Sequence, residues 1–343
     1  MLKGIAFVNL AATVLSHSAD GITVVRCPSL QSVPRKFHDD PSRIFTVTVA
    51  ESQATPVLAV GAMLGEGPVW DEREQELLFV DIIGERVHRF RPATGEHSWF
   101  RTDGPTGAVV LTEEGRLLLA LHDRFVYSSR SGENQVVVEG FQADGAVLRF
   151  NDGKVDPWGR FLVGTMDRQE AQPNGTLYML SADHSVASLV EKVSVSNGLA
   201  WTADNTTLYY IDTPTRRVDA FDVDPDIGTL SARRTVVEVR DGKPDGMTID
   251  DEGCLWVAIW DGGRVDRYAP SGELLEILRV PEGGHVTSAA FGGPTMSTLF
   301  VTTARAGLSD GELAHAPHAG DLFAYEAPIT GPPGNRFQGS PDS

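Results

Sequence analysis

Short apolar runs recur along the chain at a nearly constant spacing. Their first positions are separated by 40, 44, 47, 47 and 44 residues. The runs are residues 77–81, 117–120, 161–164, 208–212, 255–258 and 299–302. Each is too short for a helix of ordinary length and is bounded by turn-forming residues, which is typical of a buried strand. A repeat of this length built from short strands indicates a solenoid or a propeller.

The surroundings of each run are also similar. Turn sequences such as Asp-Pro-Trp-Gly at 156–159 precede the runs, and a further strand pattern such as that at 217–221 follows them. No amphipathic helical pattern alternates with the strands, which argues against a parallel α/β sheet. We therefore predict an all-β fold, a six-bladed β-propeller of four-stranded antiparallel blades over residues 51–330. A strand near residues 55–60 is expected to close the ring by pairing into the last blade.

The two ends of the chain lack this repeat. Residues 1–50 are expected to be an N-terminal extension outside the fold, and the Gly- and Pro-rich residues 331–343 a disordered tail. The first 15 residues are faintly similar to a secretory signal, which makes export the alternative to the cytoplasmic location that we expect. No apolar run approaches the roughly 18 residues of a membrane span. The two cysteines, Cys27 and Cys254, do not suggest a disulfide framework.

The charge balance restricts the partners. The chain has 29 Lys and Arg against 47 Asp and Glu, a net charge of −18. Nucleic acids and anionic membranes attract basic surfaces, so neither is an expected partner. A small molecule or a cation fits this charge better. The oligomeric state is left open.

Four polar motifs come directly before apolar strand patterns. They are residues 65–70 (Gly-Glu-Gly-Pro-Val-Trp), 149–157 (Arg-Phe-Asn-Asp-Gly-Lys-Val-Asp-Pro), 196–201 (Ser-Asn-Gly-Leu-Ala-Trp) and 244–249 (Pro-Asp-Gly-Met-Thr-Ile). A single Asn-Gly or Asp-Gly is usually only a turn. Here, however, Glu66, Asn197 and Asp245 occupy the same place in three repeats, and Arg149 and Asn151 occupy it in a fourth. The loops that lead into the innermost strands of a propeller surround its channel, so we expect these side chains to meet.

The residue types suggest a hard cation. Two carboxylates with amide oxygens form an oxygen-only set, which suits Ca²⁺, Mg²⁺ or Mn²⁺ better than Zn²⁺. The sequence therefore predicts one divalent cation, with Ca²⁺ favoured and Mg²⁺, Mn²⁺ or Zn²⁺ as alternatives.

The four motifs together resemble the senescence-marker protein/gluconolactonase/regucalcin-like family, in order and over residues 60–326. The resemblance implies a metal-dependent lactonase that opens sugar (aldono-)lactones to the corresponding acids. It implies Glu66, Asn197 and Asp245 as metal ligands, Asp245 also as the general base, and Arg149 and Asn151 as substrate-binding residues. One position departs: where some members carry a substrate-contacting Glu, this chain has Gln169 followed by Glu170. A metal-dependent phosphotriesterase and a non-catalytic calcium-binding propeller are the alternative functions.

Three further features of the sequence bear on the active site. Residues 307–311 match the Gly-x-Ser-x-Gly pattern of serine hydrolases, but Pro317 and Gly320 argue against the following helix that a nucleophile elbow needs. Trp260 and Asp261 come at the end of a strand and are candidates for lining the substrate pocket. The loop at 306–320 is long enough to restrict access to that pocket.

Overall fold

The computed structural model describes residues 15–18, 21–24, 49–133, 135–138, 143–145 and 147–342. Two compact units are present, Met1–Ala50 and Glu51–Ser343. In the first, β1 (Leu15–Ser18) and β2 (Gly21–Val24) form an antiparallel hairpin. Cys27 and most of the expected extension and signal segment lie outside the described residues. No helix in the described part of the chain is long and apolar enough to cross a membrane.

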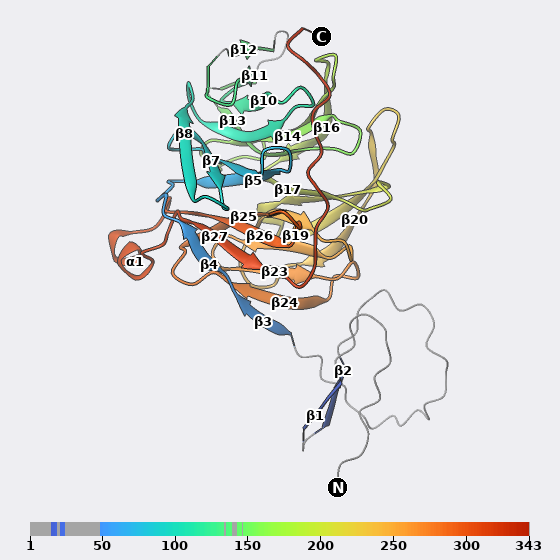
Figure 1. The fold of residues 1–343 in the computed structure, drawn as a ribbon. Helices are drawn as coiled ribbons and strands as arrows, with labels where there is room; N and C mark the ends of the chain where they lie inside the picture. Colours follow the sequence, from blue (N-terminus) through green and yellow to red (C-terminus); the bar gives the residue numbers. More distant parts are fainter. Residues whose placement is uncertain are drawn as a thin grey trace. The chain divides into compact units, whose positions relative to one another are not determined.

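The second unit is the predicted six-bladed propeller, with the blades in chain order (Figure 1). Blade 1 contains β5 (Gly65–Asp71), β6 (Glu76–Asp81), β7 (Arg86–Arg91) and β8 (Glu96–Arg101). Blade 2 contains β9 (Thr106–Leu111), β10 (Leu117–Leu121), β11 (Arg124–Ser128) and β12 (Val136–Val137). Blade 3 contains β13 (Leu148–Val155), β14 (Phe161–Asp167), β15 (Gly175–Leu180) and β16 (Val186–Val193).

The remaining blades follow the same order. Blade 4 contains β17 (Ser196–Trp201), β18 (Thr207–Asp212), β19 (Arg217–Val223) and β20 (Leu230–Glu238). Blade 5 contains β21 (Pro244–Ile249), β22 (Leu255–Ile259), β23 (Arg264–Tyr268) and β24 (Leu274–Arg279), with β3 (Ala50–Gln53) added at its outer edge. Blade 6 contains β25 (His285–Gly292), β26 (Thr298–Ala304), β27 (Leu322–Glu326) and β4 (Thr55–Leu58). The six predicted apolar runs are the second strands of the blades.

The ring is closed as the sequence suggested. β4 pairs antiparallel with β27, so the first and last parts of the propeller share one sheet. Apolar residues pack between neighbouring blades. One such cluster joins Trp256 of blade 5 to Phe291 of blade 6, whose rings meet edge to face at 6.0 Å. Closure leaves the hydrophobic faces of the blades buried against one another, which stabilises the whole ring.

The innermost strands β5, β9, β13, β17, β21 and β25 surround the channel, and each has a register shift near its start. Such β-bulges re-aim side chains near active sites. Glycines at the bulges allow neighbouring innermost strands to approach closely. A Cβ on Gly107 of β9 would lie 2.6 Å from the carbonyl oxygen of Asn151 on β13. The site residues therefore lie within these strands, whereas the sequence placed them in loops just before them.

The C-terminal segment, residues 330–338, differs from the disordered tail that the sequence suggested. It crosses the ends of the blades opposite the bulges, and residues 332–335 line a chamber of about 300 Å³ that extends along the channel to Gly67 and Asp152 at the bulges. The backbone N–H of Phe337 donates to the carbonyl of Leu111, and the Phe337 side chain is fully buried. Arg336 forms ion pairs with Asp71 and Glu72 at 2.6 and 3.1 Å. Specific pairing and burial hold a segment whose composition alone suggests disorder.

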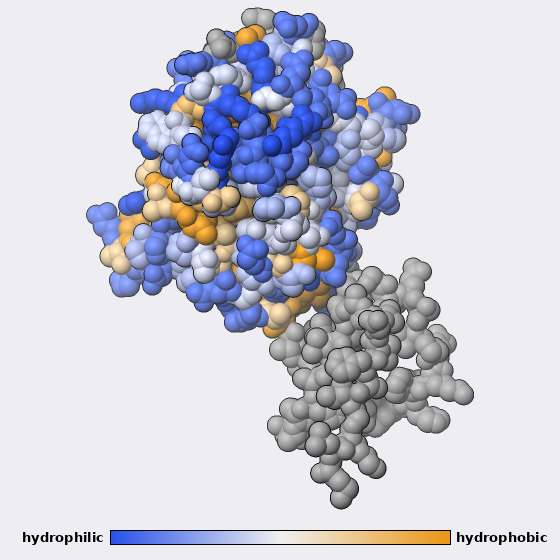
Figure 2. All heavy atoms as spheres, viewed as in Figure 1, coloured by the Kyte–Doolittle hydropathy of each residue, from blue (hydrophilic) through white to orange (hydrophobic). Residues whose placement is uncertain are grey.

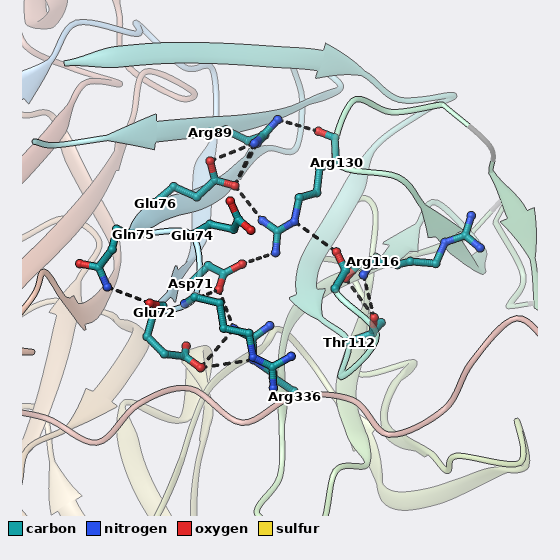
Figure 3. A network of polar contacts seen from close by, with 12 residues as sticks. Asp71, Glu72, Glu74, Gln75, Glu76, Arg89, Thr112, Arg116, Arg130 and Arg336 are labelled. Atoms are coloured by element: carbon teal, nitrogen blue, oxygen red, sulfur yellow. Dashed lines mark hydrogen bonds and ion pairs between the residues drawn. The ribbon is translucent and has the colours of Figure 1, made fainter. Parts of the chain in front are cut away.

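Arg336 joins a larger ion-pair network between blades 1 and 2 (Figure 3). Arg130 bridges Asp71 and Glu76, and Arg89 adds a 3.0 Å pair to Glu76. The two arginines beside Asp71 hold the pKa of that buried carboxyl below its usual value, although burial acts the other way. The acidic residues here are thus compensated by neighbouring guanidinium groups.

Two helical segments occur in the described part of the propeller. The 3-10 turn η1 (Thr213–Thr215) follows β18, and α1 (Asp310–His315) lies in the long connection between β26 and β27. Ser309 begins α1 with a capping box, in which Ser309 and Glu312 each bind the other's backbone N–H. The expectation that no helix follows the Gly-x-Ser-x-Gly match is therefore wrong: the six-residue α1 comes directly after Ser309, whose hydroxyl caps it.

Candidate metal and substrate site

The five predicted site residues converge at the starts of four innermost strands. Glu66 lies on β5, Arg149 and Asn151 on β13, Asn197 on β17 and Asp245 on β21. All except the partly exposed Arg149 are at least 95% buried. The circular arrangement of the blades brings together side chains up to 179 positions apart, as the number of residues from Glu66 to Asp245 shows. The sequence prediction that they meet at one end of the channel is thereby compatible with the fold.

A chain of hydrogen bonds links three of these strands, β13, β17 and β21, through the turn η1. Nη1 of Arg149 donates to Oδ1 of Asn151 at 2.6 Å, and Nδ2 of Asn151 donates to Oδ1 of Asn197 at 2.9 Å. Nδ2 of Asn197 donates to Oγ1 of Thr213 at 2.7 Å, and that hydroxyl donates to the carbonyl of Pro244 at 2.7 Å. Because the single hydrogen of the Thr213 hydroxyl is used in the hydrogen bond to the carbonyl of Pro244, this hydroxyl can only accept a hydrogen bond from Asn197. The amide of Asn197 is thus oriented with its oxygen toward Asn151.

Three buried carboxylates gather at the bulges. Glu66, Asp152 and Asp245 each accept a hydrogen bond from the backbone N–H of the glycine that follows them, Gly67, Gly153 and Gly246. This repeated contact is the local reason for the acidic-residue-plus-glycine pattern. At Gly246 the missing side chain also allows blade 6 to pack closely, because a Cβ there would lie 2.2 Å from Oγ of Ser288.

Nearby positive charges offset only part of the negative charge of these three carboxylates. Burial and then the negative charge of Asp152 raise the pKa of Glu66 to about 8, although Gly67 and Arg149 act against this rise. Burial, followed by the charges of Glu66 and Asp152, raises the pKa of Asp245 well above its usual value. Burial raises the pKa of Asp152 as well. Mutual repulsion of buried carboxylates is what a bound cation would relieve.

Two cationic side chains accompany the acids. Arg149 interacts favourably with Glu66, Glu170 and Asp245, while burial lowers its pKa to about 10, so it stays charged at neutral pH. Lys154 also lies on β13, and its ammonium donates to the carbonyl of Met247 at 2.8 Å. Burial lowers the pKa of Lys154, and the neighbouring Asp152 opposes that effect.

Sequence reasoning gave no role to Thr213 or Lys154 and did not single out Asp152 as a member of the site. Asp152 and Lys154 belong to the 149–157 motif, so their place in it was the available signal. Thr213 has no comparable signal, because its contact with Asn197 depends on how η1 folds back. Glu170, next to the departing Gln169, does contribute electrostatically to Arg149.

The donor set fits a hard divalent cation. No group of three or more His, Cys, Asp and Glu side chains in the described residues is placed to hold a metal ion. The pair Glu66 and Asp245 would therefore need the amide oxygen of Asn197 as a third ligand, and that oxygen is oriented by the contacts above. Oxygen ligands of this kind, with excess buried negative charge, suit Ca²⁺ or Mg²⁺. Hydrophilic residues cover most of the propeller in the view of Figure 2, with hydrophobic residues in smaller patches.

Fold and site together define a six-bladed propeller with a carboxylate and amide cluster at one end of its channel. Residues 64–305 match the family described as "SMP-30/Gluconolactonase/LRE-like region", and the chain belongs to this family. Regucalcin of Xenopus laevis is 41% identical over 269 residues, which are 76% of this chain and 89% of that protein.

Solved structures agree with this assignment. A calcium-binding regucalcin of Agrobacterium tumefaciens strain C58 superposes with a TM-score of 0.81 at 26% identity, covering 85% of this chain and all of that one. A luciferin-regenerating enzyme superposes with a TM-score of 0.76 at 30% identity, covering 81% of this chain and 96% of that one. Membership of a family that includes gluconolactonases supports a lactonase-type function.

Proposed function

We propose that this protein is a divalent-cation-dependent hydrolase that opens sugar (aldono-)lactones to the corresponding acids. The observation that carries the proposal is the joint placement of two buried carboxylates, an oriented amide and the Arg149–Asn151 pair at one end of the channel. A purely structural ion needs ligands but no cationic group for a substrate. Membership of the family supports lactone hydrolysis as the reaction type.

Glu66, Asn197 and Asp245 would hold the cation. When bound, it supplies Lewis acidity toward the lactone carbonyl oxygen and keeps the two carboxylates ionised at neutral pH. Asp245 accepts the proton of the attacking water; the cation would keep it ionised and make it a weak base, which is sufficient for a reactive lactone. Arg149 donates charge-assisted hydrogen bonds to substrate oxygens, and Asn151 keeps its guanidinium in place through the 2.6 Å contact.

A calcium-binding propeller without catalysis is the second candidate. It is favoured by the description of the Agrobacterium relative as a calcium-binding protein. The two candidates share the cation ligands and differ at Arg149. Lactone turnover therefore separates them, whereas cation binding does not.

The test measures proton release from gluconolactone, galactonolactone, xylonolactone and arabinonolactone. Cation-depleted protein is compared with protein reloaded with Ca²⁺, Mg²⁺, Mn²⁺ or Zn²⁺. We expect cation-restored turnover, lost by about 10²–10⁴-fold in Asp245→Asn. Arg149→Met should keep the cation-induced rise in Tm but lose about 10–100-fold in kcat/KM. Asp241→Asn, whose side chain is 92% exposed, is the control.

The outcomes separate the candidates. Cation-induced stabilisation without turnover of any lactone would support the calcium-binding propeller. If the same cation-loaded protein cleaved a phosphotriester instead, the substrate class would be wrong and the site right. Full lactonase activity in both Asp245→Asn and Asn197→Ala would overturn the site.

A further inference from the structure

A second, open cavity of about 860 Å³ lies on blades 5 and 6. It is formed by Asp261 after β22, by His285 at the start of β25, and by residues 308–316, which include α1. α1 projects from one side of the propeller in Figure 1. Cavities of this size hold ligands larger than one sugar ring. Neither the proposed cation ligands nor Arg149 and Asn151 are among the residues that line it.

The wall of this cavity is connected to both carboxylate strands. The backbone N–H of Trp260 donates to the carbonyl of Lys243 at 2.9 Å, and Oδ1 of Asp261 accepts from the N–H of Lys243 at 2.8 Å. Lys243 is two residues before Asp245. The Trp260 side chain packs against the cluster that contains Leu64, two residues before Glu66. The cavity wall is therefore packed against segments that come two residues before each of the two proposed carboxylate ligands.

His285 forms a flat part of this wall. Its ring stacks on Trp260 with centroids 4.3 Å apart and planes 10° apart. Nδ1 of His285 lies 3.0 Å from the carbonyl oxygen of Trp260, which can only accept, so Nδ1 carries the proton. In the tautomer that this contact selects, Nε2 is the hydrogen-bond acceptor of the ring. The stack holds the imidazole rigidly, as a binding surface requires.

The other polar groups of the cavity are also mainly acceptors. Nδ1 of His315 lies 2.8 Å from the carbonyl of Gly311, so its Nε2 is likewise an acceptor in the neutral ring. Oε2 of Glu312 binds the N–H and hydroxyl of Ser309, which leaves Oε1 available. Among the described residues that line the cavity there is no Lys or Arg. Such a lining favours a ligand rich in hydroxyl donors and disfavours a phosphate or carboxylate.

We propose that this cavity binds a neutral glycosyl group carried by the lactone, so that the protein accepts the lactone of a disaccharide aldonic acid. The inference rests on the proposed lactonase function. The ring to be opened lies by Asp245 and Arg149, and the second sugar lies against His285. Its hydroxyls donate to His285 Nε2, Glu312 and Asp261. His285 and Glu312 are then specificity residues that do not take part in the chemical step.

The test compares kcat/KM for cellobionolactone and gluconolactone in cation-loaded protein. In wild type we expect the larger lactone to be preferred. In His285→Ala this preference should fall by about 10-fold or more with gluconolactone turnover unchanged. Glu312→Gln removes the charge but preserves the capping box, since Gln serves equally there. His184→Ala, in the turn between β15 and β16, is the control.

Direct binding supplies an independent measurement. Calorimetry with cellobionate, the opened product, should show binding to wild type that is weakened in His285→Ala. A wild-type preference for gluconolactone, or an equal ratio in all variants, would overturn the proposal for the cavity while leaving the lactonase function intact. Absence of turnover of both lactones would instead contradict the lactonase function, and cellobionate binding would still decide the cavity. Zn²⁺ uptake lost in both His285→Ala and His315→Ala would identify a cation site and overturn the glycosyl proposal.

Discussion

The hydroxyl of Thr213 accepts a 2.7 Å hydrogen bond from Nδ2 of Asn197 and donates a hydrogen bond to the carbonyl of Pro244. This one contact connects η1 to two of the strands that carry proposed cation ligands. It also determines which end of the Asn197 amide faces the site. Groups that orient a ligand commonly affect metal affinity as strongly as a ligand does.

Thr213→Val should therefore weaken cation binding about 10–100-fold while the propeller stays folded. Valine keeps the shape of threonine but removes the hydroxyl that holds the Asn197 amide. Calcium affinity measured by calorimetry tests this. Thr215→Val is the matched control, because Thr215 also lies in η1 and its hydroxyl donates to a carbonyl, that of Asp212 at the end of β18. Equal affinities in the two variants would contradict the role of Thr213.

Cation binding should release protons near neutral pH. Without a cation, burial and Asp152 raise the pKa of Glu66 to about 8, so Glu66 holds a proton over much of the range below pH 8. A cation needs the ionised carboxylate and displaces that proton. Affinity should therefore rise as the pH rises from about 6 to 8. Calorimetry in buffers of different ionisation enthalpy measures the released protons, and a heat independent of the buffer would contradict this expectation.

The C-terminal segment should contribute strongly to stability. Phe337 is fully buried in the cluster that contains Tyr127 and Phe125 of blade 2. Phe337→Ala should lower the free energy of unfolding by about 3–5 kcal/mol, because it removes a large buried ring and leaves a cavity. Urea unfolding measures the loss. Ile227→Ala, at a side chain that is 61% exposed, should change stability by less than about 0.5 kcal/mol. Similar losses in both variants would show that the segment does not contribute specifically.

Acid should destabilise the protein through His88. This side chain is buried between Phe79 and His97, with ring centroids at 4.8 and 5.3 Å. Burial, and then the charge of His97, lower the pKa of His88 from 6.5 to about 4. Between these values the unfolded chain binds a proton that the folded protein does not, so stability falls as the pH falls.

The expected loss from His88 is about 2 kcal/mol between pH 7 and pH 5. In His88→Phe, which keeps a ring against Phe79, that part of the pH dependence should disappear. Urea unfolding of wild type and variant at the two pH values measures the difference. The interpretation fails if the variant loses as much stability on acidification as the wild type.

The sequence by itself determined the architecture. The spacing of the apolar runs predicts six blades, because each blade is a local hairpin arrangement whose strands follow one another in the chain. Closure by residues near 55–60 followed from the need to cover the last sheet edge. Glu66, Asn197 and Asp245 were recognisable because a repeated fold places equivalent positions of its repeats around one axis.

Only the tertiary structure decided the contacts that do not repeat. The C-terminal segment is held by pairs such as Arg336 with Asp71, which are 265 residues apart and have no periodic signature. Thr213 acts through a hydroxyl whose partners come from two other segments. The cavity beside His285 needs α1, a single insertion into blade 6. Repetition makes local strand pattern and ring position readable from the sequence, whereas long-range polar contacts depend on how each irregular segment folds back onto the ring.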